Sequence, residues 1–277
     1  MKPVVLTAAL NFTVKLAVMM GICGGGWRAC ADDPPAHRSR INYDLFDQGR
    51  YVYERNCLLC HGVKGDGNGE FAKDLQPKPR SFREGWFKFR TTPYDKLPTD
   101  DDLRRTITGG LSGTAMGMFT GLSSSEVTAV IEYVKTFSRR WRHAENDAPA
   151  LEMPEPPAWL RNADATRSHA SAGNVLFATI CATCHGAKGD GNGLAVPALK
   201  DGWGFPAQPA DLRQAHLRCG DGAADIFRIL STGMSGTPMV NFAPALTEVQ
   251  RWDIAAYILS IRLPPPGVLG APVKTAQ

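Results

Sequence analysis

The sequence predicts an all-α fold that is divided between two tandem domains. At 277 residues the chain is long enough for two domains of small size. Two blocks of sequence each occur twice, in the same order and about 124 residues apart, which indicates an internal duplication. Apolar residues around these blocks recur at helical spacing, whereas the alternation typical of strands is scarce. A duplicated helical domain is therefore expected.

The composition is that of a soluble globular protein, with 43% hydrophobic and 21% charged residues. The formal net charge of +4 is weak, and the first 31 residues carry three bases and no acid. A nucleic-acid-binding surface would need a concentrated basic field. We therefore expect no nucleic-acid partner.

The first 31 residues have the pattern of an export signal. Two apolar runs, at 4–9 and 16–23, are followed by small residues suited to cleavage, Ala29-Cys30-Ala31. A membrane anchor is the alternative, but Lys15 between the two runs would be costly inside a bilayer. We expect residues 1–31 to be a cleaved signal peptide and the mature protein to be periplasmic.

The first repeated block is Cys-x-x-Cys-His, followed in both copies by Gly-x-Lys-Gly-Asp-Gly-Asn-Gly. In such a motif the two thiols add to the vinyl groups of a haem, and the adjacent imidazole binds the iron. A redox dithiol or half of a zinc site would use the same two cysteines. The adjacent histidine, the repetition and the export signal favour haem. The predicted sites are two covalently bound haem c groups, attached through Cys57, Cys60, Cys181 and Cys184, with iron ligands His61 and His185.

The second repeated block, Gly-x-Ser-Gly-Thr-x-Met, ends at Met116 in one copy and at Met239 in the other. A methionine sulfur as sixth ligand raises the potential of a haem and suits electron transfer. Each repeat offers a second methionine, but neither Met118 nor Met234 aligns with a methionine in the other repeat. The repeat therefore selects Met116 and Met239 as axial ligands, and packing by an adaptable apolar side chain is the alternative.

The flanking segments complete a small helical domain. A glycine lies eight residues ahead of the first motif cysteine in both repeats, as Gly49 and Gly173, with an aromatic residue four residues further on. This spacing places both on one helix face, where glycine permits close crossing by another helix. Asp102 and Asp225 are expected in the first turn of a shorter helix before each methionine block. The helices expected to make the crossing end each repeat, within 123–141 and 246–262.

With these motifs, both repeats resemble class I cytochrome c domains, and the chain resembles the periplasmic two-domain dihaem cytochromes. The resemblance covers about residues 43–263 and implies an all-α chain of two such domains joined by a proline-rich linker. It also implies that a proline carbonyl after each haem motif orients the imidazole. The candidate prolines are Pro77, Pro79, Pro206 and Pro209. The domains are placed at 42–142 and 168–264, with a linker at 143–167 and a tail at 265–277.

Ligation determines the expected function. With histidine and methionine on both irons, neither haem offers a vacant position to a substrate, so we expect an electron carrier without catalytic residues. The expected partners are redox proteins, such as a monohaem cytochrome, a cupredoxin, a periplasmic oxidoreductase or a terminal oxidase. One alternative is a dihaem enzyme of the peroxidase or thiosulfate-oxidising type, which is expected to keep one haem without methionine. The other is a fixed cytochrome subunit of a larger oxidoreductase.

A basic run at 78–90 lies where the first repeat has a longer insertion, at 81–99, between its haem motif and its methionine. Such a run is either a docking patch or a solvated face. The acidic residues nearby, Asp95 and those at 100–102, favour the solvated face.

Overall fold

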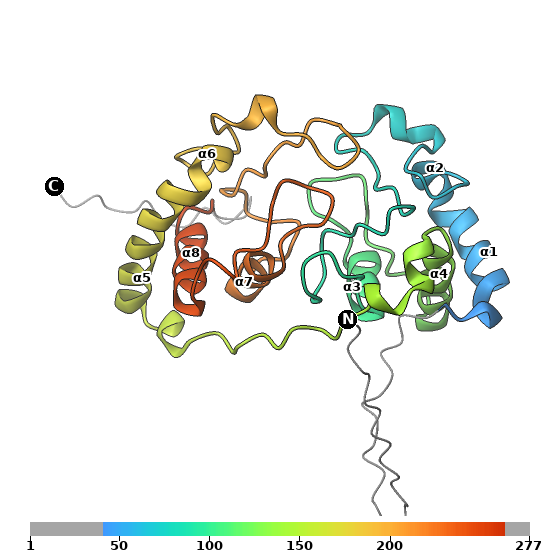
Figure 1. Cartoon of the computed structure of the whole chain (residues 1–277), viewed down its shortest axis with the longest axis horizontal. Helices are drawn as coiled ribbons and strands as arrows, with labels where there is room; N and C mark the ends of the chain where they lie inside the picture. Colours follow the sequence, from blue (N-terminus) through green and yellow to red (C-terminus); the bar gives the residue numbers. More distant parts are fainter. Residues whose placement is uncertain (1–40, 264–277) are drawn as a thin grey trace, which may run out of the picture. The chain divides into compact units, whose positions relative to one another are not determined.

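The computed structural model describes residues 41–263, in which four α-helices of the first repeat recur in the same order in the second (Figure 1). The first repeat contains α1 (Phe46–Asn56), α2 (Leu58–His61), α3 (Asp100–Gly109) and α4 (Ser124–Thr136). The second contains α5 (Ala163–Leu176), α6 (Ala182–His185), α7 (Ala223–Thr232) and α8 (Glu248–Ser260). Short 3-10 turns occupy Tyr43–Leu45, Glu70–Asp74, Arg139–Arg142, Ala144–Asn146, Ala158–Arg161 and Val196–Ala198, and a π-helical turn spans Phe177–Cys181.

The all-α prediction is confirmed, because the one β-type pairing within 41–263 is an isolated bridge. No helix in this range is both long enough and apolar enough to cross a bilayer. The expected signal peptide at 1–31 and the expected tail at 265–277 lie outside the described residues.

The centre of each repeat is a helix crossing. α1 packs against α4, and α5 packs against α8 (Figure 1). A Cβ atom added at Gly49 would lie 2.1 Å from the carbonyl oxygen of Ala129, and one at Gly173 would lie 2.0 Å from that of Asp253. Any larger residue would push the two backbones apart, so the close crossing predicted at both glycines is confirmed.

Apolar side chains fill the space around each crossing. In the first repeat Val52 and Tyr53 of α1 meet Val130 and Val134 of α4. In the second repeat α7 also contributes, and its Phe227 belongs to a larger buried cluster with residues of α8. Each such side chain contributes roughly 1.5–3 kcal/mol when it is fully buried. The crossings therefore hold the segments that carry the haem motifs.

The two acidic residues expected at helix starts lie at the third position of α3 and α7. Asp102 accepts a hydrogen bond from the backbone N–H of Thr99 at 3.0 Å, and Asp225 accepts one from Gly222 at 3.2 Å. Each carboxylate thus caps an N–H group at the positive end of its helix. Both helices begin earlier than their aspartates, as a cap at the third position requires.

Only the exposed part of the basic run at 78–90, at Lys78 and Arg83, is the solvated face that the sequence favoured. Arg90 is 0% exposed, and the Arg80 guanidinium lies 4.4 Å from the ring centroid of Trp203 in the second repeat. The acids expected to balance the run pair elsewhere: Asp95 with Arg140, and the first acid of α3 with a lysine of α4. The insertion of the first repeat therefore lies against the second repeat.

The chain between the repeats runs without regular structure from residue 147 to residue 157. Its middle is held by the first repeat, because the N–H of Leu151 donates to the carbonyl of Thr91 at 2.8 Å. Its end is held by the second repeat, where the Trp159 ring stacks on His169 of α5 with centroids 3.7 Å apart. The stretch between these two contacts runs in an extended form (Figure 1), which its prolines favour.

Candidate functional site

Each Cys-x-x-Cys-His motif lies on a short helix that continues the first long helix of its repeat. α1 leads through Cys57 into α2, and a π-helical turn ending at Cys181 leads into α6. The N–H of His61 donates to the carbonyl of Cys57 at 2.8 Å, so the thiols and the imidazole leave one helical turn. All four motif cysteines are free. Burial raises the pKa of Cys57 to about 12 and that of Cys181 to about 11, which keeps both as thiols.

The glycine-rich segment after each motif folds back onto it. The N–H of Gly67 donates to the carbonyl of His61 at 3.0 Å, and that of Gly191 donates to the carbonyl of His185 at 2.8 Å. These two glycines have φ values of +76° and +78°, in the left-handed region that favours glycine. The repeated glycines therefore close a tight turn beside each histidine.

Both imidazoles are oriented by backbone carbonyls. His61 Nδ1 lies 3.0 Å from the carbonyl oxygen of Arg80, and His185 Nδ1 lies 3.3 Å from that of Ala210. When Nδ1–H donates to these oxygens, Nε2 keeps its lone pair for a metal. Burial lowers the pKa of both imidazoles, which favours this neutral form.

The prediction that proline carbonyls orient the imidazoles is wrong for all four candidates. Each acceptor belongs to the residue directly after a proline. The carbonyls of Pro79 and Pro209 instead face the glycine turns, at 2.5 Å and 2.7 Å from a Cβ added at Gly67 or Gly191. Pro77 and Pro206 also do not serve as acceptors.

The two methionine loops have the same internal hydrogen bonds. The N–H of Leu111 donates to the carbonyl of Met116 at 2.9 Å, and that of Met234 donates to the carbonyl of Met239 at the same distance. A threonine hydroxyl two residues before each predicted ligand donates across the turn at 2.8 Å in both loops. Met116 and Met239 thus have equivalent places, whereas Met118 lies outside this turn and is 71% exposed.

The residues present fit a haem in each repeat. A pair of free thiols and an imidazole with an uncommitted nitrogen leave one helical turn, and a thioether is carried on a separate loop. In the second repeat Cys181 and Met239 pack against the same apolar cluster. Within 41–263, Met116 joins none of the three buried clusters. The same range holds no group of three His, Cys, Asp or Glu residues placed to bind a bare metal ion.

Residues that connect the two repeats were missed at the sequence level. The rings of Trp86 and Trp203 meet edge to face with centroids 5.3 Å apart, and Arg80 contacts both His61 and Trp203. A signal was present, because each repeat contains one Gly-Trp pair between its haem motif and its methionine. The two pairs are not equivalent in the repeat, so the alignment of the copies did not bring them out.

One protein-family model matches the chain twice, once in each repeat. The family model described as Cytochrome c matches residues 46–138 and 170–262. A chain of the Kuenenia stuttgartiensis reducing HAO-like protein complex Kustc0457/Kustc0458 is 32% identical, with a TM-score of 0.75. That similarity covers 81% of this chain and 100% of the other.

Two curated relatives are subunits of cbb3-type cytochrome c oxidases. FixP of Azorhizobium caulinodans is 27% identical over 169 residues, and CcoP of Azospirillum brasilense is 25% identical over 179 residues. Each match covers 60% of this chain. The chain spans about half the length of these relatives, 48% and 50%.

Proposed function

Because the chain belongs to the cytochrome c family and carries its domain twice, we propose that it relays single electrons through two haems with histidine–methionine ligation. It is a dihaem electron-transfer protein with two covalently bound haem c groups. When bound, each haem supplies a one-electron iron couple. In the proposal His61 and Met116 hold the first iron, and His185 and Met239 hold the second.

The equivalence of the two methionine loops carries this proposal. Their hydrogen bonds match one for one, and each loop belongs to a repeat whose imidazole is oriented by a carbonyl. A hydrogen bond at Nδ1 raises the basicity of the ligating nitrogen, and a thioether ligand favours the reduced iron. With both axial positions taken in both domains, the protein acts as a carrier and not as a peroxidase or a thiosulfate-oxidising enzyme.

A fixed cytochrome subunit is the second candidate. Its support is that the similar proteins are subunits of cbb3-type oxidases and a chain of a multi-protein complex. The partners we propose are a monohaem cytochrome, a cupredoxin, a periplasmic oxidoreductase or a terminal oxidase. Gel filtration of tagged protein from its native cells separates the candidates, because a carrier elutes alone and a subunit elutes with its partners.

We place the two domains at 42–142 and 168–264 and the mature protein in the periplasm. Cleavage after residue 31 would make Asp32 the first residue of the mature chain. N-terminal sequencing of protein recovered from the periplasm tests this. An uncleaved leader in the membrane fraction would support the anchored alternative.

The ligands are tested by substitution. Met116→Ala and Met239→Ala should each remove about half of the far-red methionine-to-ferric-iron absorption and lower one haem potential, because each removes one sulfur ligand. Met118→Ala and Met234→Ala are the matched controls and should change neither. Two covalent haems should be present by haem stain on a denaturing gel and by intact mass. Loss of the band in a control variant would contradict the assignment.

A further inference from the structure

The two methionine loops differ in what surrounds them. In the second repeat Ser235 is 3% exposed, and a Cβ added at Gly236 would lie 3.1 Å from carbon atoms of Trp203 and of Trp86. In the first repeat a Cβ added at Gly113 or at Gly117 would meet no described atom within 4 Å. Among the described residues, the second loop is therefore covered at Ser235 and Gly236, and the corresponding part of the first loop is open.

Arg90 braces the start of the covered loop. This residue of the first repeat donates to the carbonyls of Thr232 at 2.7 Å and Gly233 at 3.5 Å in the second. Thr232 is the last residue of α7, and Gly233 caps it and begins the block that ends at Met239. A guanidinium here meets the negative end of the helix dipole, and hydrogen bonds from a buried charged donor are strong.

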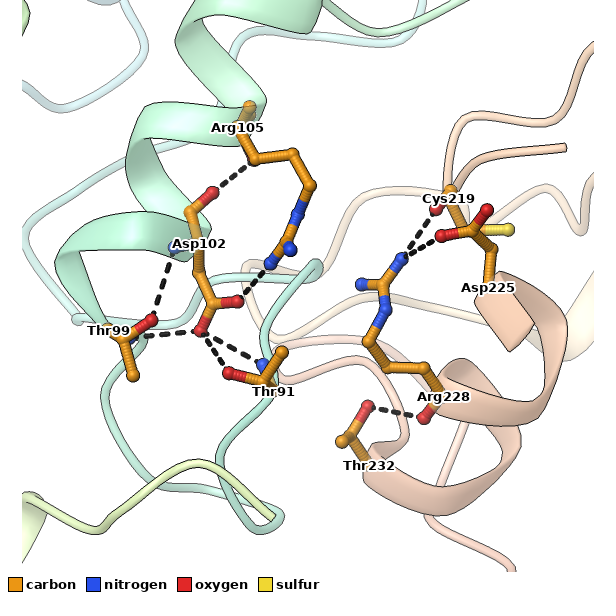
Figure 2. Close-up of polar contacts among 9 residues, drawn as sticks. Thr91, Thr99, Asp102, Arg105, Cys219, Asp225, Arg228 and Thr232 are labelled. Carbon is orange, nitrogen blue, oxygen red and sulfur yellow. Dashed lines mark hydrogen bonds and ion pairs between the residues drawn. The ribbon is translucent and has the colours of Figure 1, made fainter. Parts of the chain in front are cut away.

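Arg90 is itself held in place within the first repeat. Its guanidinium also donates to the carbonyls of Pro93 at 3.2 Å and Phe87 at 3.3 Å. The N–H and the hydroxyl of the next residue, Thr91, donate to the buried carboxylate of Asp102 at 2.9 Å and 3.0 Å (Figure 2). The segment that carries Arg90 is therefore anchored to α3, which holds the guanidinium in a fixed position.

Among the residues that the structure describes, the first repeat has no such contact. Gly109 and Gly110 at the end of α3 correspond to Thr232 and Gly233, 123 residues later. Within 41–263 no side chain donates to the carbonyl of Gly109 or of Gly110. The loop of Met116 thus depends on its own internal hydrogen bonds.

We propose that Arg90, Trp86 and Trp203 fix the loop of Met239, so that Met116 is the exchangeable axial ligand and the first haem binds small iron ligands such as imidazole. The exchange breaks the bond from iron to sulfur and forms one from iron to an imidazole nitrogen, with no electron or proton transferred. It requires the methionine to move away, so its equilibrium includes the free energy of opening the loop. This inference rests on the proposed ligation by Met116 and Met239.

The test is a titration of the ferric holoprotein with imidazole, followed through the far-red methionine band. The band should disappear in two steps of similar size, separated by at least about tenfold in imidazole concentration, as a brace of about 1.4 kcal/mol would require. In Met239→Ala the remaining band should disappear at the lower concentration. In Met116→Ala it should disappear at the higher one.

Variants of Arg90 and Trp86, which contact the loop of Met239, sharpen the test. Arg90→Gln should move the second step about tenfold toward the first and leave the first step in place. Trp86→Leu should act in the same direction, and it serves if the first variant does not fold. The matched control is Arg83→Gln, an exposed arginine of the same segment, which should leave both steps unchanged.

One shared step in the wild type, earlier loss of the Met239 band, or a second step that neither brace variant moves would overturn the inference. If both haems are covalently present but the methionine band is absent, the proposed ligation fails and this inference falls with it. Two separated steps that merge only in the brace variants would support both.

Discussion

Asp102 and Arg105 in α3 repeat as Asp225 and Arg228 in α7 (Figure 2), yet the exposure of the paired side chains is reversed between the two pairs. In the first repeat the aspartate side chain is 0% exposed and the arginine 53%. In the second the arginine is 8% exposed and the aspartate 35%. The duplication has kept the pair, but each copy buries the opposite member.

The inversion follows from what each buried group holds. The carboxylate of Asp102 accepts hydrogen bonds from Thr91 in the insertion of the first repeat. The guanidinium of Arg228 donates to the carbonyl of Cys219, in the segment before α7, at 2.7 Å. Each repeat thus uses the charge that suits its own unrepeated segment.

The largest expected effect is at the helix crossings, where the repeats should behave alike. Gly49→Ala and Gly173→Ala should each lower the free energy of unfolding by about 4 kcal/mol, because the new methyl group meets backbone that must move. Denaturant unfolding of the holoprotein, followed by circular dichroism, measures this. Gly121→Ala is the control, since an added Cβ there meets no described atom within 4 Å. A loss in only one repeat would show that the crossings are not equivalent.

An intermediate effect is expected at the inverted ion pairs. Asp102→Ala should cost about 3 kcal/mol, because it leaves buried donors without an acceptor, and Arg105→Ala should cost less than about 1 kcal/mol. In the second repeat the order should reverse, with about 2 kcal/mol for Arg228→Ala and about 1 kcal/mol for Asp225→Ala. Urea unfolding of the four variants measures the order. Equal losses of unfolding free energy within each pair would show that burial of one member does not determine how much it contributes to stability.

The smallest effect is expected from acid, at the residue after each imidazole-orienting carbonyl. This residue is Ser81 in the first repeat and Asp211 in the second. Hydrogen bonds from the Arg213 side chain, both at 2.9 Å, hold the pKa of Asp211 well below its ordinary value. Because the pKa is lower in the folded state, the stabilisation is complete above the unfolded pKa of about 4 and is lost as the pH falls further.

The acid prediction is measured on Asp211→Asn beside the wild type. The wild type should be slightly more stable at neutral pH, and the difference should shrink progressively below about pH 4. Asp47→Asn is the control, because the exposed carboxylate of Asp47 lies 3.6 Å from its arginine, Arg50, and its replacement should change stability little at any pH. A difference that is constant from pH 7 to pH 3 would show that the ion pair does not contribute through its charge.

The parts that the sequence predicted are those in which chemistry requires a fixed spacing. Haem attachment requires the cysteines and the histidine on one helical turn, and a close helix crossing requires Gly49 and Gly173. Both features could therefore be predicted from the spacing of residues in the sequence. The role of the Arg80 carbonyl was predicted for Pro77 or Pro79, because the direction of a carbonyl depends on backbone angles that residue types do not determine. Arg90 was misjudged for another reason. A buried arginine that binds carbonyls of another domain leaves no local pattern.

The tryptophan contact between the repeats bears on how the chain can evolve. Trp86 follows the carbonyl that orients His61, whereas Trp203 precedes the carbonyl that orients His185. A chain assembled from two copies of either present repeat would therefore lack one of the two rings. The halves are no longer interchangeable modules, although their haem motifs still match. Any exchange of one domain must therefore keep both unlike segments, the one with Trp86 and the one with Trp203, to retain the ring contact between the repeats.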